Sequence, residues 1–128
     1  MIDHTGLEVS NPEKSRDFYL KALACINYEV IAEIPKEYTG GAVVLGFGVQ
    51  PKAEFWMSEG KPNTPRIHIA FRAERREQVD EFYKNALAAG GKDNGAPGPR
   101  PHYHENYYGA FVLDPDGHNI EVVCHEKP

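Results

Sequence analysis

The stretch Tyr107–Cys124, YYGAFVLDPDGHNIEVVC, decides the fold of the second half of the chain. Its two apolar runs, Ala110–Leu113 and Ile120–Val123, are separated by a segment rich in Asp, Pro and Gly. Runs of β-branched and aromatic residues on both sides of such a segment predict a β-hairpin. Glu121 interrupts the second run, where an ionised carboxylate is costly unless it is paired or binds a cation. Its position points to a partner elsewhere in the chain.

Length and composition restrict the class of protein. The chain has 128 residues and a mass of 14.3 kDa, which suits one domain with its own core. A net charge of −5 without a basic run argues against nucleic acid or a membrane as a partner. No secretory signal or membrane-spanning stretch is evident, so we expect a cytoplasmic protein. Cys25 and Cys124 lack metal-site spacing and are interpreted as reduced structural thiols.

The hydrophobic pattern predicts a mixture of strands and helices. One helix is expected from Pro12 to about Ala24 with Asn11 as its N-cap, and a second over residues 75–89. Residues 92–100, rich in Gly and Pro, are expected to form at best a short edge strand. Five further strands are predicted over residues 2–10, 28–34, 41–48, 53–58 and 66–73.

The second half of the chain repeats the first. At an offset of 64 residues His4 aligns with His68, and Phe18-Tyr19 aligns with Phe82-Tyr83. Ala22-Leu23-Ala24 aligns in the same way with the segment at 86–88. We interpret the chain as one α+β domain of two βαβββ modules, at about residues 1–60 and 65–125. The modules are expected to form a curved, partly open mixed sheet around a concave site for a small molecule.

The repeat predicts where the unusual polar residues meet. His4 and His68 occupy equivalent first strands, and Glu121 lies on the last strand of the second module. Two imidazoles and one carboxylate on three strands make a facial metal triad that leaves coordination positions open. This set suits one divalent ion of iron, manganese, nickel, zinc or cobalt. Taken singly, each histidine would more often be a surface residue or a satisfied core residue than a ligand, and Glu121 is compatible with a solvated edge-strand carboxylate.

These segments resemble the vicinal oxygen chelate superfamily, which includes glyoxalase I, bleomycin- and fosfomycin-resistance proteins and extradiol dioxygenases. The resemblance covers essentially the whole chain and is most specific from the DPDG sequence to Glu121. It implies a glyoxalase-like fold, a divalent metal bound by His4, His68 and Glu121, and a homodimer. The stretches that carry it are His4–Val9, Phe18-Tyr19, Ile67–Ala70 and Phe111–Glu121.

One branch of this superfamily carries a further ligand that is missing here. Glyoxalase I has a second glutamate on the last strand of its first module, where the repeat offset gives Met57 or, with a one-residue slip, Trp56. Glu54 points to the same strand face as Trp56 but is displaced by about 6–7 Å along the strand. Glyoxalase I activity is therefore not expected. Trp56 is interpreted as an apolar wall of the pocket or as core.

The extradiol dioxygenases have a histidine and a tyrosine ahead of the glutamate ligand. His104 stands at a compatible distance, but Phe111 occupies the tyrosine position and can donate neither a hydrogen bond nor a proton. Dioxygenase chemistry through His104 thus remains an alternative without the full motif.

The loop at residues 100–108, RPHYHENYY, concentrates the remaining chemistry. His104 and Tyr103 are the candidate general acid or base residues. Candidate substrate-binding residues are Trp56, Phe111, His102 and Arg66. A loop packed on the protein or at a dimer interface is the alternative, as is a surface arginine for Arg66. His118 and His125 are expected to be solvated residues without a role.

Two classes of function follow from these residues. The first is a metal-dependent enzyme, a lyase, isomerase or dioxygenase-like protein, that chelates adjacent oxygens of a small substrate. The second is a non-catalytic protein of the bleomycin-resistance type that sequesters a small molecule. An intact triad favours the enzyme, because a sequestering pocket does not need three convergent ligands.

Overall fold

The computed structural model describes all 128 residues. A strand, a helix and three strands occur in this order twice, which confirms the predicted βαβββ modules. The first module consists of β1 (Thr5–Val9), α1 (Pro12–Ala22), β2 (Glu29–Glu33), β3 (Val44–Val49) and β4 (Lys52–Glu59). The second consists of β5 (His68–Ala73), α2 (Arg76–Ala88), β6 (Lys92–Pro99), β7 (Tyr108–Leu113) and β8 (Asn119–Cys124).

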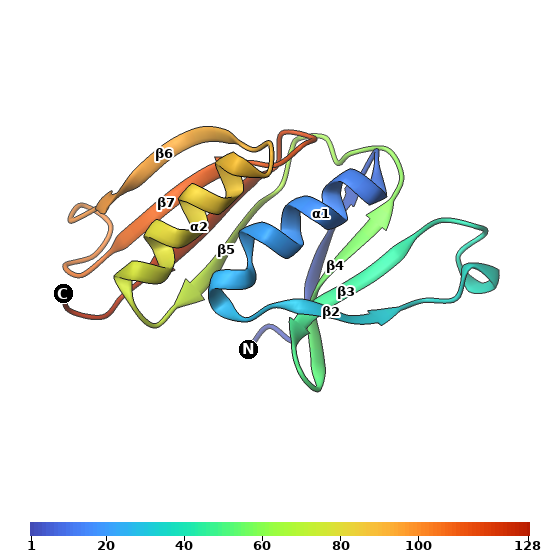
Figure 1. Cartoon of the computed structure of the whole chain (residues 1–128), viewed down its shortest axis with the longest axis horizontal. Helices are drawn as coiled ribbons and strands as arrows, with labels where there is room; N and C mark the ends of the chain where they lie inside the picture. The colour runs from blue at the N-terminus through green and yellow to red at the C-terminus, as the bar shows by residue number, and fades with distance from the viewer.

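Each module forms its own four-stranded mixed sheet. The strand orders are β1-β4-β3-β2 and β5-β8-β7-β6, and in each sheet the first two strands are parallel. No ladder joins β1 to β5, so the predicted partly open mixed sheet consists of two separate four-stranded sheets, one from each module. Figure 1 shows the two sheets side by side, with both helices on the same side of the molecule.

The helices cover one face of each sheet. The Asn11 side chain accepts a hydrogen bond from the Lys14 amide at 3.1 Å, which confirms it as the N-cap of α1. α1 packs on β4, α2 packs on β7 and β8, and the helices pack on each other (Figure 1). The opposite faces of both sheets are left without a helix.

The core is continuous from one module to the other. Alternate residues of β5, such as Ile69 and Phe71, are buried, while His68 and Ala70 point to the open face. Phe55 of β4 meets Phe71 edge to face, with ring centroids 5.3 Å apart. The two modules therefore share one apolar interior.

β6 is longer than the sequence predicts. It spans eight residues despite Pro97 and Pro99, and it pairs only with β7. Proline is tolerated there because β6 is an edge strand and its ladder is interrupted by irregularities around Gly95.

The turn between β7 and β8, residues 114–118, joins the second module to the first. The Asp114 carboxylate is buried and accepts hydrogen bonds from the Tyr19 hydroxyl and from the His118 amide. Asp116 accepts a hydrogen bond from the Ser10 amide at 3.0 Å. We call residues 114–118 the inter-module turn.

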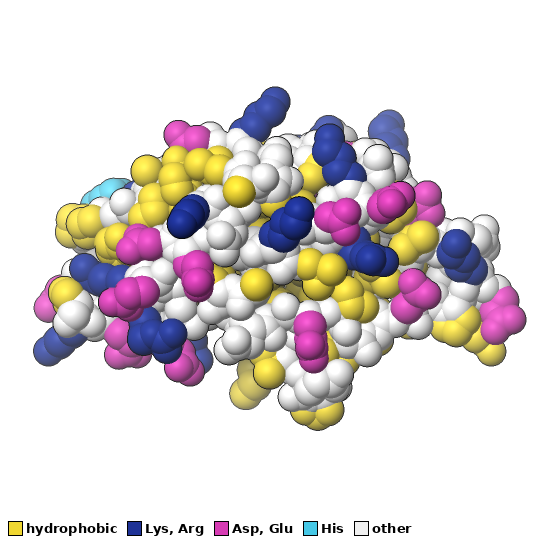
Figure 2. Space-filling view, in the orientation of Figure 1, with side chains coloured by type: hydrophobic (Ala, Val, Ile, Leu, Met, Phe, Trp, Pro, Cys, Tyr) yellow, Lys and Arg dark blue, Asp and Glu magenta, His cyan; other side chains and the backbone are white.

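The helical side of the molecule carries charges of both signs. Figure 2 shows Lys and Arg side chains interspersed with Asp and Glu over this face, without a large patch of one sign. No helix has the length and apolar character that crossing a membrane requires.

Candidate functional site

The open face of the second sheet brings two of the predicted ligands together. The parallel register of β5 and β8 pairs His68 with Asn119 and Ala70 with Glu121. Glu121 is flanked along β8 by residues that face the core, so its side chain points to the open face. It is only 1% exposed, because β8 lies between β5 and β7 and the side chains of His68 and Tyr107 contact the carboxylate.

Two side chains contact the buried Glu121 carboxylate. Its Oε1 atom lies 2.9 Å from Nε2 of His68, and its Oε2 atom accepts a hydrogen bond from the Tyr107 hydroxyl. Such contacts offset the cost of burying a carboxylate. Burial and this hydrogen bond to Glu121 raise the pKa of the Tyr107 phenol. Tyr107 therefore stays a hydrogen-bond donor over the physiological pH range.

The contact of Tyr107 with Glu121 could not be predicted from the sequence. The sequence placed it in the loop at 100–108 without distinguishing it from its neighbours. Only the pairing of β7 with β8 shows that Tyr107, two residues before Gly109, reaches Glu121. The cluster of aromatic residues in this loop was the only feature of the sequence that pointed towards Tyr107.

The predicted catalytic residues of this loop lie further from Glu121 than Tyr107 does and do not contact its carboxylate. Tyr103 is 62% exposed and its ring packs on that of Tyr107, with centroids 5.1 Å apart. His104 accepts a hydrogen bond from the Asn106 amide and packs on His125. Neither Tyr103 nor His104 has a hydrogen bond to Glu121.

The predicted substrate-binding residues are divided between several places. Phe111 pairs with Glu121 across β7 and β8, and its ring lies 6.2 Å from that of His68. His102 packs on Tyr103 and is exposed. Arg66 donates hydrogen bonds to the backbone carbonyls of residues 63 and 116, so its guanidinium is held in the loops.

His4 lies on the other module. It precedes β1 and contacts Asp3, with the Nδ1 atom 2.6 Å from the carboxylate. A hollow of about 580 Å³ adjoins it on the open face of the first sheet. The hollow is lined by His4, Thr5, Gly6, Ile34, Val44, Trp56 and Ser58.

His4 lies at the opposite end of β1 from the contact that joins β1 to the start of β5. Glu8, near the end of β1, contacts His118 of the inter-module turn, and β5 starts beside this contact. About 13 Å of extended chain separates Glu8 from His4. No three His, Cys, Asp or Glu side chains are grouped so that they could hold a metal ion. Within one chain, His4, His68 and Glu121 therefore do not form a three-ligand cluster.

The sheet registers identify the counterpart of Glu121 in the first module. Gly6 pairs with Trp56 as Ala70 pairs with Glu121, and Gly6 aligns with Ala70 in the repeat. Met57 is fully buried in the core. Trp56 is half-buried on the open face, so it forms an apolar wall and not core. Glu54 is engaged by the Tyr28 hydroxyl at 2.7 Å.

His118 is not a solvated residue, contrary to the sequence-based expectation. Its side chain is fully buried, and its Nδ1 atom accepts a hydrogen bond from the Ile67 amide at 3.0 Å. Its Nε2 atom therefore carries the proton and donates to the Glu8 carbonyl at 2.9 Å. His118 thus links the last hairpin to β1 and to the start of β5.

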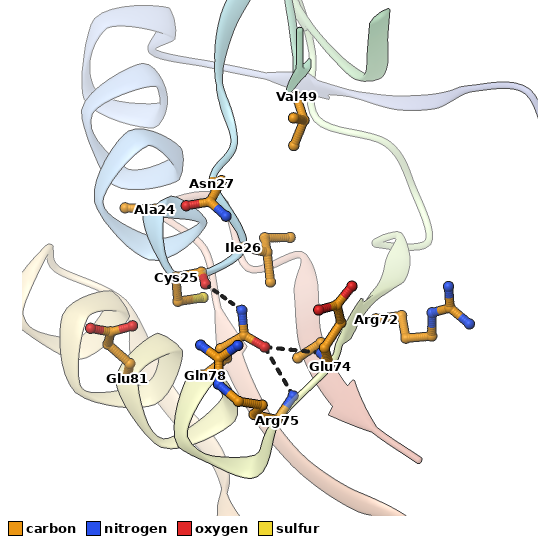
Figure 3. A pocket seen from close by; sticks show the side chains of 11 residues that line it. Ala24, Cys25, Ile26, Asn27, Val49, Arg72, Glu74, Arg75, Gln78 and Glu81 are labelled. Atoms are coloured by element: carbon orange, nitrogen blue, oxygen red, sulfur yellow. Dashed lines mark hydrogen bonds between the residues drawn. The ribbon is translucent and has the colours of Figure 1, made fainter. Parts of the chain in front are cut away.

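A second hollow, of about 540 Å³, lies at the junction of the modules and contains none of the predicted site residues. Figure 3 shows Gln78 in its wall, bonded to the Cys25 carbonyl and to the amides of residues 74 and 75. Every polar atom of the Gln78 side chain is thereby engaged within the protein. This hollow reflects how α2 begins, and it presents no free buried group to a ligand.

Comparison with known families assigns the chain. Residues 1–122 match the family described as the Glyoxalase/Bleomycin resistance protein/Dioxygenase superfamily. The chain belongs to this superfamily. No curated protein matches the sequence.

Solved structures of other members of this superfamily share the fold. A glyoxalase/bleomycin resistance protein from Albidiferax ferrireducens is 21% identical, with a TM-score of 0.71 over 95% of this chain and 97% of that chain. A variant of glyoxalase I from Zea mays is 17% identical, with a TM-score of 0.71 over 99% of this chain and 45% of that chain. A variant of the fosfomycin resistance protein FosX from Listeria monocytogenes, complexed with Mn(II) and 1S,2S-dihydroxypropylphosphonic acid, is 23% identical, with a TM-score of 0.65 over 95% and 87%.

Two donor atoms of this superfamily member have a spacing that suits a divalent ion. His68 Nε2 and Glu121 Oε1 are 2.9 Å apart. Neighbouring ligands of an octahedral ion with bonds of about 2.1 Å are about 3.0 Å apart. One imidazole and one carboxylate therefore have the spacing of two adjacent ligands of such an ion.

Proposed function

We propose that the protein is a metal-dependent enzyme that acts on a small substrate with two adjacent oxygen atoms. The observation that carries this proposal is the Glu121 carboxylate, buried on an open sheet face with Oε1 at 2.9 Å from His68 Nε2. A buried carboxylate beside an imidazole is costly to keep for stability alone and useful for holding a cation. His68 and Glu121 supply two of three protein ligands in this proposal, and His4 supplies the third.

The third ligand comes from a second copy of the chain in this proposal. His4 and His68 lie on different modules, on sheet faces that no helix covers. If the first sheet of one copy faces the second sheet of another, His4 of one meets His68 and Glu121 of the other. A twofold homodimer arranged in this way contains two equivalent sites.

Each proposed site consists of two half-sites: His4 with its neighbours on the first sheet, and His68 with Glu121 on the second. The residues around them indicate which chemical groups the substrate contains. A divalent ion held by the triad would supply Lewis acidity to the oxygens of the substrate. Trp56 and Val44 of the first sheet and Phe111 of the second would bind the apolar remainder. Trp56 offers no carboxylate at the position equivalent to Glu121, so we do not propose the glyoxalase I isomerisation.

Metal analysis of mixed variants tests the proposed site. Wild-type protein purified without chelator is expected to contain about one divalent ion per chain, whereas His4→Ala and His68→Ala dimers contain little. When these two variants are co-expressed, half of the dimers are hybrids with one intact site. The metal content of the mixture is then expected to rise to about one quarter of the wild-type value. Elemental analysis after size-exclusion chromatography measures it.

A matched control uses two variants of the same half-site. Co-expressed His68→Ala and Glu121→Gln chains each carry a defective second module, so no hybrid has an intact site. Their metal content is expected to stay at the level of the separate variants. Wild-type protein without metal would refute the enzyme proposal, and full metal content in His4→Ala would refute the role of the second copy.

The hollow beside Trp56 favours a second candidate function. Its floor contains Ile34, Val44 and Trp56, which suits sequestration of a small apolar molecule without chemistry. Thermal-shift screening identifies compounds that stabilise the metal-loaded protein. If each of these compounds is recovered chemically unchanged after incubation with the protein, the result favours sequestration over the enzyme.

A further inference from the structure

We infer that Tyr107 is a positioning residue that restricts Glu121 to binding metal through one oxygen atom. This inference rests on the proposed metal site and assigns to it a residue outside the ligand triad. The Tyr107 hydroxyl donates a hydrogen bond to Oε2 of Glu121, while Oε1 faces His68. The two carboxylate oxygens are therefore not equivalent.

Aromatic neighbours hold the Tyr107 ring in place. The Tyr103 ring packs against it with centroids 5.1 Å apart and an interplanar angle of 71°. The His125 ring also packs against it, with centroids 5.3 Å apart and an interplanar angle of 84°. A hydroxyl on a ring held by two edge-to-face contacts has little freedom to leave the carboxylate.

Gly109 provides the space that this contact needs. A Cβ atom at position 109 would lie 3.1 Å from the Tyr107 ring and 3.3 Å from Oε2 of Glu121. Both contacts are tight, so a side chain at this position would press on the hydrogen-bonded pair. The backbone there is fixed by the pairing of Gly109 with Val123 across β7 and β8.

One-oxygen binding has a consequence for the substrate. A carboxylate can bind a cation through one or both oxygens, and the second oxygen occupies a further coordination position. With Oε2 held by Tyr107, the residues His4, His68 and Glu121 would fill about three of the six positions of an octahedral ion. The other positions would then be free for two adjacent oxygens of a substrate.

Conservative substitutions test this role. Tyr107→Phe removes only the hydroxyl and is expected to weaken Co²⁺ binding about 10- to 100-fold, the usual effect of losing a partner of a metal ligand. The visible absorption of the Co²⁺ form is also expected to change, because Oε2 is free to enter the coordination sphere. Titration calorimetry and absorption spectroscopy measure the two effects.

Tyr108→Phe is the matched control. This neighbouring hydroxyl binds Asp80 on α2, on the side of the sheet away from Glu121. Its removal is expected to leave Co²⁺ affinity within about 3-fold of wild type and the spectrum unchanged. Gly109→Ala serves as a second test variant and is expected to resemble Tyr107→Phe.

Each result decides between defined alternatives. Wild-type Co²⁺ affinity and spectrum in Tyr107→Phe would overturn the positioning role and leave the proposed metal site intact. Weaker binding with an unchanged spectrum would show a contribution to affinity alone and would overturn one-oxygen binding. Failure of the wild type to bind Co²⁺ would overturn both this inference and the proposed function.

Discussion

His118 connects three segments through one imidazole ring. Its Nδ1 atom accepts the Ile67 amide hydrogen bond and its Nε2 atom donates to the Glu8 carbonyl. Both contacts require the neutral ring with the proton on Nε2, because a protonated ring has no acceptor nitrogen. The side chain is completely buried, so the loss of either bond leaves a backbone group without a partner.

Removal of this ring is expected to destabilise the protein. His118→Ala should lower the free energy of unfolding by about 2–4 kcal/mol, because it breaks two buried hydrogen bonds and leaves a cavity. Urea denaturation measures the loss. His102→Ala, at an exposed position, is the control and is expected to stay within about 0.5 kcal/mol of wild type. Equal stability of the two variants would contradict the bridging role.

Sequence alone found two of the residues that meet at the candidate site. Glu121 was identified because a carboxylate in an apolar run needs a partner, and His68 because the repeat placed it on an equivalent strand. Tyr107 and His118 were not identified, because their roles depend on contacts with β8 and with β1. A turn between two strands is usually solvated, and here the first module covers it.

At the scale of elements, the inter-module turn and α1 form one unit. The Tyr19 hydroxyl of α1 donates to Asp114 although the two residues are 95 positions apart. Burial, followed by the charge of Asp114, raises the pKa of Tyr19 well above its usual value of 10.0. The carboxylate also accepts from the amides of Asp116 and His118. This explains why an Asp opens the turn.

The repeat offers an internal control for the Tyr19 contact. Tyr19→Phe leaves the buried Asp114 carboxylate without its side-chain donor and is expected to cost about 1–3 kcal/mol of stability. Tyr83, which aligns with Tyr19 in the repeat, has its hydroxyl near Asp93 at the surface. Tyr83→Phe is expected to have a much smaller effect in the same urea titration. Similar losses of unfolding free energy in the two variants would show that the contact with Asp114 stabilises the protein no more than a surface contact does.

Local sequence patterns predicted the individual elements well, because capping, strand alternation and turn formation depend on residues that are close in sequence. The Asn11 cap, the alternation in β5 and the Asp-Pro-Asp-Gly turn each depend on neighbours in sequence. The length of β6 was underestimated because proline normally weakens a strand. An edge strand pairs on one side only, so it needs only half of its backbone groups for hydrogen bonds within the sheet.

At the scale of the whole molecule, the placement of one module against the other could not be predicted. The repeat indicates two βαβββ modules but carries no information on which contacts join them. These contacts link residues as far apart as Glu8 and His118, 110 positions apart. For the same reason the sequence does not show that the three predicted ligands fail to form one cluster within a single chain.

The shared interior predicts a loss of stability at alkaline pH. Burial raises the pKa of the Cys25 thiol from 9.0 to about 12. The folded-state pKa lies above the unfolded one, so this contribution is fully present below about pH 9 and is lost as pH rises towards 12. Each such group lowers the unfolding free energy by up to about 1.4 kcal/mol per pH unit in this interval.

Urea titrations at several pH values above 8 test this dependence. The Cys25→Ala variant is expected to show a shallower decline than wild type from about pH 9, where only the unfolded thiol ionises. The buried tyrosines continue the decline at higher pH in both proteins. Parallel curves for the two proteins would contradict the assignment to Cys25.

The outermost strands have a consequence for aggregation. β2 and β6 each leave one row of backbone groups unpaired, which is where cross-β fibrils can grow. Pro97 and Pro99 remove amide donors from β6, and Glu29 and Glu33 place negative charge at both ends of β2. Both edge strands are thus poor templates for amyloid. The proposed association of two copies uses the uncovered faces of the sheets and not these edges.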